Sequence, residues 1–189
     1  MRKTSLLEML DMQPASVVPS DPNLGIVFDN MVSEWGGTRY AQLAVVLVHL
    51  NFLTYVHHTH HWLSKGDVFY GDHLLFQRLY LATQEQVDGI GERVVGLGGE
   101  DGVNLPLQVA QLNKLVKGYG MTTTIPQPSE LARRSLLAEQ NFLAVMKLAA
   151  QQLDEQGMLT RGLDNLMQGI EDLHESHVYL LKQRCKATA

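Results

Sequence analysis

The histidines of this chain are concentrated in two short stretches, and imidazole is the commonest metal ligand in proteins. Six of the eight lie between residues 49 and 73, and the other two are His174 and His177. The first stretch leads into a series of potential ligands: His61, His73, Gln77, Asp88 and Glu92. Residues four apart share one face of a helix, which pairs His73 with Gln77 and Asp88 with Glu92. The pattern indicates a metal site carried by helices.

Helical spacing of apolar residues predicts the elements that position these ligands. Four long helices are expected at about residues 38–64, 68–97, 129–157 and 161–184. The second ends at Gly98-Gly99, a common helix stop, and the third begins with Ser129 as its N-cap. The segment 100–128 is a long crossover that contains a short amphipathic helix.

Two short turns on either side of one long crossover are typical of an all-α, ferritin-like four-helix bundle. The expected domain covers residues 36–185, and residues 186–189 form a short C-terminal tail. Residues 1–35 contain several prolines and no sustained period, so they are interpreted as an extended N-terminal arm that Met31, Val32 and Trp35 dock onto the body.

Helix geometry decides how the ligands can be combined. At 1.5 Å per residue, His73 and Glu92 lie ~28 Å apart along one helix, so one chain cannot bring both to the same ion. Gln77, Asp88 and Glu92 lie at roughly 40°, 60° and 100° from His73 around the axis, which places all four on one stripe. If this helix packs antiparallel against its copy across a two-fold axis, two equivalent mixed sites form at the dimer interface.

Composition limits the classes of protein that fit. With 45% hydrophobic and 19% charged residues, the chain is expected to be globular. The most apolar stretch, residues 43–56, is too short for a membrane span and is interrupted by His49 and Asn51. The absence of a signal-like start and the lone Cys185 favour a cytoplasmic location. A net charge of −5 argues against a body that is wholly a nucleic-acid-binding surface.

Several of these motifs together resemble the Dps mini-ferritins, the DNA-protecting proteins of starved cells. The resemblance covers about residues 35–185. It is carried by His61-Trp62, by His73 twelve positions later, by Asp88-Gly-Ile-Gly-Glu92-Arg93-Val-Val-Gly-Leu97-Gly98-Gly99, and by the segment from Asp172 to Leu181.

The resemblance implies a hollow dodecamer built from two-fold dimers. In that family, interfacial sites oxidise Fe(II), usually with hydrogen peroxide, and the ferric mineral is stored inside. It implies that His61 and His73 of one subunit bind iron together with Asp88 and Glu92 of another. It also places Trp62 beside the metal and Asp164 in a pore through which iron enters.

One position departs from the family's pattern, because Gln77 stands where most members have an aspartate. A neutral amide there weakens the preference for iron, and a histidine-rich site with fewer carboxylates favours Zn(II) or Cu(II). Nearby histidines are candidates to compensate as metal ligands: His57, His58, His174 and His177.

Three functions therefore stand side by side. The first is a ferroxidase and iron-storage cage that protects against oxidative damage. The second is a non-enzymatic metal buffer for zinc. The third is DNA binding through Arg2, Lys3, Lys182, Arg184 and Lys186, which is expected to be weak because the body is acidic.

Overall fold

The sequence folds almost entirely into helices. The computed structural model describes residues 23–119 and 126–186. Its elements are α1 (Leu24–Ser33), α2 (Ala41–Leu63), α3 (Phe69–Gly98), a 3-10 helix η1 (Glu100–Val103), α4 (Leu105–Gly118), α5 (Pro128–Glu155) and α6 (Arg161–Lys186).

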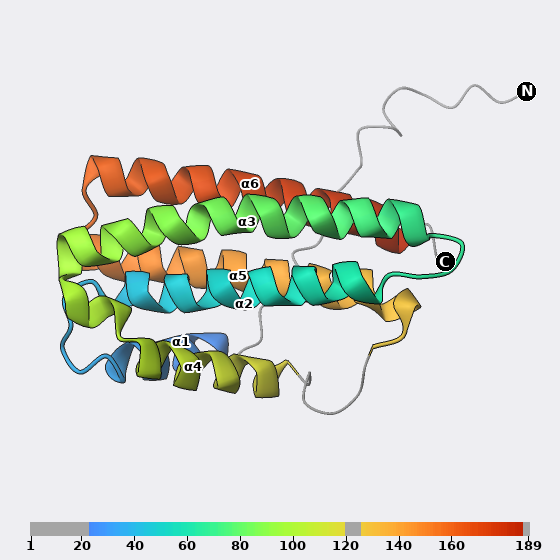
Figure 1. The fold of residues 1–189 in the computed structure, drawn as a ribbon. Coiled ribbons are helices and arrows are strands. Elements are labelled where there is room, and N and C mark those ends of the chain that lie inside the picture. Colours follow the sequence, from blue (N-terminus) through green and yellow to red (C-terminus); the bar gives the residue numbers. More distant parts are fainter. Residues whose placement is uncertain (1–22, 120–125, 187–189) are drawn as a thin grey trace, which may run out of the picture.

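The four long helices α2, α3, α5 and α6 run side by side and form a bundle (Figure 1). Helices α3 and α6 lie along one side of it, and the shorter α1 and α4 lie along the opposite side, next to α2 and α5 (Figure 1). The predicted all-α, ferritin-like bundle, with a long crossover that contains a short helix, is therefore confirmed.

Helix α2 is the centre of the hydrophobic core. Every residue from Ala41 to Leu50 is buried, because α3 and α5 cover one side of this helix and α1 and α4 cover the other. A helix enclosed in this way needs apolar side chains all round rather than a single stripe. Ile90, Phe142 and Met146 pack into the same core from α3 and α5. Within residues 23–119 and 126–186, none of the helices has the apolar stretch that a membrane span requires.

Helix α1 corrects the expectation of an extended chain over residues 24–33. Phe28, Met31 and Trp35 follow helical spacing and are buried, and the Trp35 indole N–H donates to the side-chain oxygen of Gln111 at 3.2 Å. The prolines upstream hid this short period in the sequence. The expected docking of Met31 and Trp35 is confirmed, while residues 1–22 lie outside the described residues and the boundary at residue 35 stays a prediction.

The start of α5 also differs from the prediction. Ser129 lies within the first turn, and Gln127 is the N-cap. Gln127 and Glu130 form a reciprocal capping box, and Pro128 occupies the first helical position, where its missing N–H costs nothing. The pair Gln127 and Glu130 therefore marks the start of α5 more accurately than the hydroxyl of Ser129 does.

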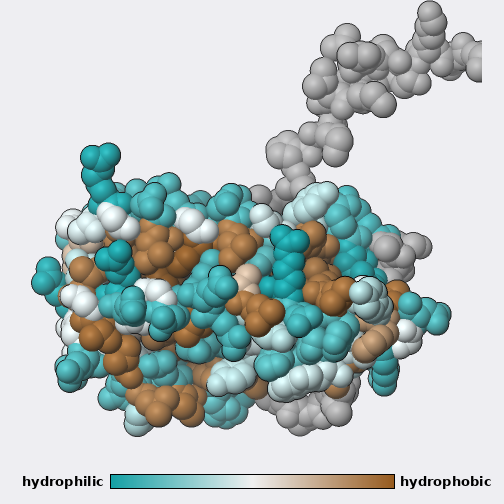
Figure 2. Space-filling view, turned by 45° about the horizontal axis from the view of Figure 1, so that its top comes forward, coloured by the Kyte–Doolittle hydropathy of each residue, from teal (hydrophilic) through white to brown (hydrophobic). Residues whose placement is uncertain are grey.

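Some large apolar side chains remain on the surface of α3. Tyr70, Leu74, Leu81 and Val95 are between 41% and 74% exposed. Figure 2, turned so that the side of the bundle carrying α3 and α6 comes forward, shows apolar patches among hydrophilic residues. A monomeric protein rarely exposes large contiguous apolar areas, so this face is a candidate for contact with another surface.

A pair of glycines near the end of α3 tests the packing of this bundle end. A Cβ on Gly98 would lie 2.3 Å from the backbone oxygen of Arg39, whereas a Cβ on Gly96 would meet nothing within 4 Å. We expect Gly98→Ala to lower the free energy of unfolding by about 1–3 kcal/mol, because backbone must shift. Gly96→Ala should raise it by up to about 1 kcal/mol through helix propensity.

Urea unfolding followed by circular dichroism measures both variants. Equal changes in the two, or a Gly98→Ala protein as stable as the wild type, would contradict the close approach of Arg39.

Candidate functional site

Two of the predicted ligands, His61 and His73, meet where α2 ends and α3 begins. Their rings stack with centroids 3.7 Å apart. The Nδ1–H of His61 donates to the backbone oxygen of His73 at 2.9 Å, and the Nδ1–H of His73 donates to the backbone oxygen of His61 at 3.2 Å. The structure therefore brings these two residues together by a reciprocal pair of hydrogen bonds.

These hydrogen bonds determine the chemistry of the two rings. A neutral imidazole that donates through Nδ1 carries its lone pair on Nε2. Metal-bound histidines in proteins are commonly oriented in the same way, with the other ring nitrogen donating to a carbonyl. Both rings are half-buried, so His61 and His73 present two adjacent Nε2 lone pairs at the rim of the bundle.

Aromatic rings surround this pair. His58 stacks on Tyr80 with centroids 4.2 Å apart and lies 6.2 Å from the His61 ring. Trp62, which is 67% exposed, contacts His58. Of the additional histidines proposed for this site, His58 is therefore beside it.

The predicted carboxylates lie elsewhere on α3. Asp88 and Glu92 are exposed, and within the described part of the chain neither forms a hydrogen bond or ion pair. They lie 15 and 19 residues beyond His73 on a continuous helix, which is roughly 22 and 28 Å along its axis. One chain does not bring them to the histidines. Gln77 is half-buried, one turn from His73.

Asp164, the predicted pore residue, is half-buried in the first turn of α6 and accepts a hydrogen bond from the Gln168 side chain at 2.9 Å. Its role in a pore stays a prediction, because a pore would need neighbouring subunits.

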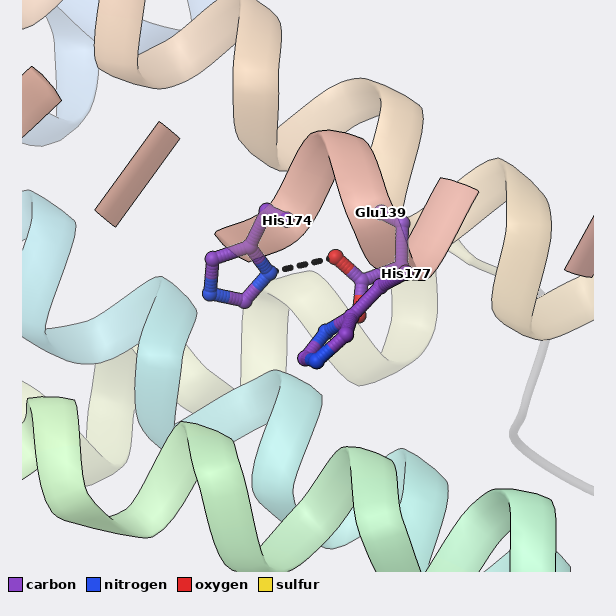
Figure 3. Close-up of side chains that lie close together, drawn as sticks. All are labelled: Glu139, His174 and His177. Atoms are coloured by element: carbon purple, nitrogen blue, oxygen red, sulfur yellow. Dashed lines mark hydrogen bonds and ion pairs between the residues drawn. The ribbon is translucent and has the colours of Figure 1, made fainter. Parts of the chain in front are cut away.

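A second group of potential ligands lies inside the bundle. Glu139 of α5 faces His174 and His177 of α6, and one ligand atom from each lies within 4.8 Å of the other two (Figure 3). The three residues are at most 1% exposed. Their ligand atoms are close enough together to hold one metal ion.

Three imidazoles share the Glu139 carboxylate. Nε2 of His57 lies 2.7 Å from Oε1, and Nδ1 of His177 lies 3.1 Å from the same oxygen. Nδ1 of His174 lies 2.5 Å from Oε2. Each of these ring nitrogens donates a hydrogen bond to the carboxylate, so a single acidic side chain of α5 connects to both α2 and α6.

A chain of hydrogen bonds continues from this group. The Nδ1–H of His60 donates to Ser135 Oγ at 2.7 Å, and the Ser135 hydroxyl donates to Nδ1 of His57 at 3.2 Å. Nε2 of His174 faces the side-chain oxygen of Gln86 on α3 at 2.7 Å. All four long helices thus contribute polar atoms to one level of the bundle.

Electrostatics keep this group ionised at its centre. Burial alone raises the pKa of Glu139, but the charge of His174 and the hydrogen bonds from His174, His177 and His57 outweigh it, so that the pKa lies well below its usual value. Burial lowers the pKa of His57 despite the Glu139 hydrogen bond, and it lowers the pKa of His60 to about 3.

The structure corrects the placement of three histidines that were expected to supplement the His61 site. His57, His174 and His177 turn toward Glu139 in the interior. His57 and His61 are four residues apart on α2 and so lie on the same face of the helix, but His57 is fully buried whereas His61, near the end of α2, is half-buried. Glu139 was not among the predicted ligands, although it stands within an apolar stripe with Ala138 and Phe142, where a carboxylate is itself a signal of a buried polar site.

Comparison with known proteins gives three relatives, while no family model matches the chain. A "Nutrient stress-induced DNA-binding protein" of Nostoc sp. is 28% identical over 71% of this chain and 73% of its own length. "DNA protection during starvation protein 2" of Bacillus anthracis is 26% identical over 66% and 81%. A "Nutrient stress-induced DNA-binding protein" of Synechococcus sp. is 29% identical over 64% and 65%.

His49, outside both groups, permits a test of the buried imidazoles. It is 4% exposed and donates to the backbone oxygen of Val45, yet burial lowers its pKa to about 4. Since the unfolded state binds a proton near pH 6.5 and the folded state does not, stability is full above that pH and falls as the pH drops toward 4. We expect His49→Gln to reduce the loss of unfolding free energy between pH 7 and pH 5 by about 2 kcal/mol.

Urea unfolding at the two pH values checks this expectation. Asn51→Ala is the control, because Asn51 also donates to a backbone oxygen four residues back but does not titrate. A pH dependence in His49→Gln equal to that of the wild type would show that folding does not lower the pKa of His49.

Proposed function

Because the chain is a homologue of Dps-type proteins, we propose that it is a cytoplasmic ferroxidase and iron-storage protein. It oxidises Fe(II), preferably with hydrogen peroxide, at sites shared between two subunits of a dodecamer. The observation that carries this proposal is the His61–His73 pair. Nδ1 of each ring is used in a hydrogen bond within the chain, so Nε2 of each ring is available to a metal ion.

The missing ligands come from a second copy of α3. His73, Asp88 and Glu92 lie on one stripe of this helix, with the histidine near one end and the carboxylates near the other. In an antiparallel two-fold contact between two copies of α3, the His73 end of one copy meets the Asp88 and Glu92 end of the other, so that two identical sites form. The absence of any partner for Asp88 and Glu92 among the described residues agrees with ligands that await another chain.

The apolar residues on α3 support such a contact. At 100° per residue, Tyr70, Leu74, Leu81 and Val95 all lie within roughly 100° of His73, on the same side as Asp88 and Glu92. The partner helix would cover their exposed area. Apolar side chains that alternate with ligands along one stripe would exclude water from the site and fix the register of the two copies.

The proposed site suits the chemistry of its substrate. Two imidazoles and two carboxylates bind Fe(II) and stabilise Fe(III) more strongly, since carboxylate oxygens favour the harder ion. Two Fe(II) ions give one electron each to hydrogen peroxide, which takes up two protons and yields two molecules of water. Gln77 adds a neutral amide one turn from His73, where an aspartate would add a negative charge. The alternative role as a zinc buffer rests on this smaller number of carboxylates at the site.

DNA binding is the weaker candidate, although the names of two relatives contain it. Arg184, one of the basic residues near the C-terminus, forms a two-point ion pair with the buried Asp72, with Nε–Oδ1 at 2.5 Å and Nη2–Oδ2 at 3.0 Å. Arg2 and Lys3 lie outside the described residues. A dodecamer would carry a formal charge of about −60.

We expect no complex with duplex DNA in a gel-shift assay at ~150 mM salt, because the net negative charge of the chain opposes the DNA phosphates. A band shift that persists at this salt concentration would show that DNA binding is part of the function.

Mixed dimers test the shared site. One variant, His61→Ala with His73→Ala, lacks the imidazoles, and the other, Asp88→Ala with Glu92→Ala, lacks the carboxylates. Each alone should oxidise Fe(II) at the uncatalysed rate. When both are co-expressed in equal amounts, half of the dimers are mixed and each keeps one of its two sites, so the rate should recover to about one quarter of the wild-type rate.

Ferric absorbance after anaerobic Fe(II) loading and peroxide addition measures the rate. Asp154→Ala with Glu155→Ala removes two exposed carboxylates from the end of α5 and should leave it unchanged. A mixture no faster than its separate components would rule out sharing between chains, and wild-type oxidation by either single-type variant would rule out its residues as ligands.

A further inference from the structure

We infer that the interior of the bundle holds a second metal site, complete within one chain, in which Glu139, His174 and His177 bind a divalent first-row transition metal ion. This site is separate from the one proposed between subunits, because its side chains face the core rather than the rim. It does not depend on the iron-oxidising function.

The spacing of the ligand atoms suits a metal ion. In a tetrahedral site with bonds of ~2.0–2.1 Å, neighbouring ligand atoms lie about 3.3 Å apart. Nδ1 of His177 lies 3.1 Å from one Glu139 oxygen, and Nδ1 of His174 lies 2.5 Å from the other. Moving Nδ1 of His174 by about 0.8 Å and Nδ1 of His177 by about 0.2 Å away from these oxygens would reach that spacing, and a cation would then replace the shared protons.

The hydrogen bonds of the interior leave one of these residues unsatisfied. Nε2 of His177 is buried and is the one buried side-chain nitrogen or oxygen without a hydrogen-bond partner in the part of the chain that the structure describes. A buried imidazole nitrogen without a partner is unfavourable, and such groups commonly mark a binding site.

The surrounding residues would orient the ligands. His57 donates to Glu139 and is itself held by Ser135, while Gln86 contacts the outer nitrogen of His174. Partners of this kind fix the rotamer and the tautomer of metal ligands in proteins. The site therefore has both an inner set of three ligands and a set of side chains that holds them in place.

The ligand set indicates the class of ion. Two imidazoles and one carboxylate suit Zn(II), Co(II) and Fe(II), whereas Mg(II) and Ca(II) prefer sites made of oxygen atoms. Three protein ligands leave a further coordination position, as in metal sites that bind water or substrate.

Cobalt titration tests the inference on the assembled protein. The His61→Ala, His73→Ala chain serves as the background, so that the site between subunits cannot contribute. After metal removal, we expect it to bind one Co(II) per chain, with the visible absorption bands of a nitrogen-ligated ion. In this background, His177→Gln and Glu139→Gln should each weaken binding more than ~100-fold.

His49→Gln is the matched control, because it removes a buried histidine outside the cluster and should leave Co(II) binding unchanged. A second measurement does not depend on the folding of any variant: a wild-type crystal soaked in Zn(II) should give an anomalous peak among Glu139, His174 and His177. No peak there, or Co(II) binding in the background chain that is equal with and without Glu139 and His177, would overturn the inference. The Co(II) titration and the anomalous peak do not depend on iron oxidation. A mixed-dimer assay without recovery of the oxidation rate would therefore contradict the proposed function and leave this inference standing.

Discussion

The interior of this protein depends on the hydrogen bonds between the buried Glu139 carboxylate and the imidazoles around it. A carboxylate in a dry core is unfavourable unless hydrogen-bond donors surround it, and three histidines from two other helices supply them. Because α3 joins through Gln86, the relative heights of all four long helices are constrained at this level. Apolar contacts alone tolerate sliding, whereas these directional contacts do not.

The chain distributes its histidines between two environments with different requirements. At the rim, His61 and His73 are half-buried and bond only to each other's backbone, which leaves room for ligands from outside. In the core, His57, His174 and His177 have their protein partners within the same chain. His57 and His61 share one face of α2, but His61 lies one turn nearer to the end of the helix and is only half-buried there.

Much of this architecture was predictable from residue spacing. The four long helices follow apolar repeats. The resemblance implied that His61 and His73 act together, and their rings stack where α2 ends and α3 begins. The position of Glu139 in an apolar repeat of α5 indicates that it is buried, but its histidine partners were not predictable, because they come from helices distant in sequence. Helix α1 was missed because three buried residues, Phe28, Met31 and Trp35, give too short a period.

The reciprocal hydrogen bonds between His61 and His73 have a consequence for affinity. Each ring is held by the other residue's backbone, so both side chains have given up most of their rotational freedom when the chain folds. A ligand that binds them meets a preorganised pair and loses little further entropy. The turn between α2 and α3 thereby holds both rings rigidly, and the conformational entropy of the two side chains is lost once, during folding, rather than at every binding event.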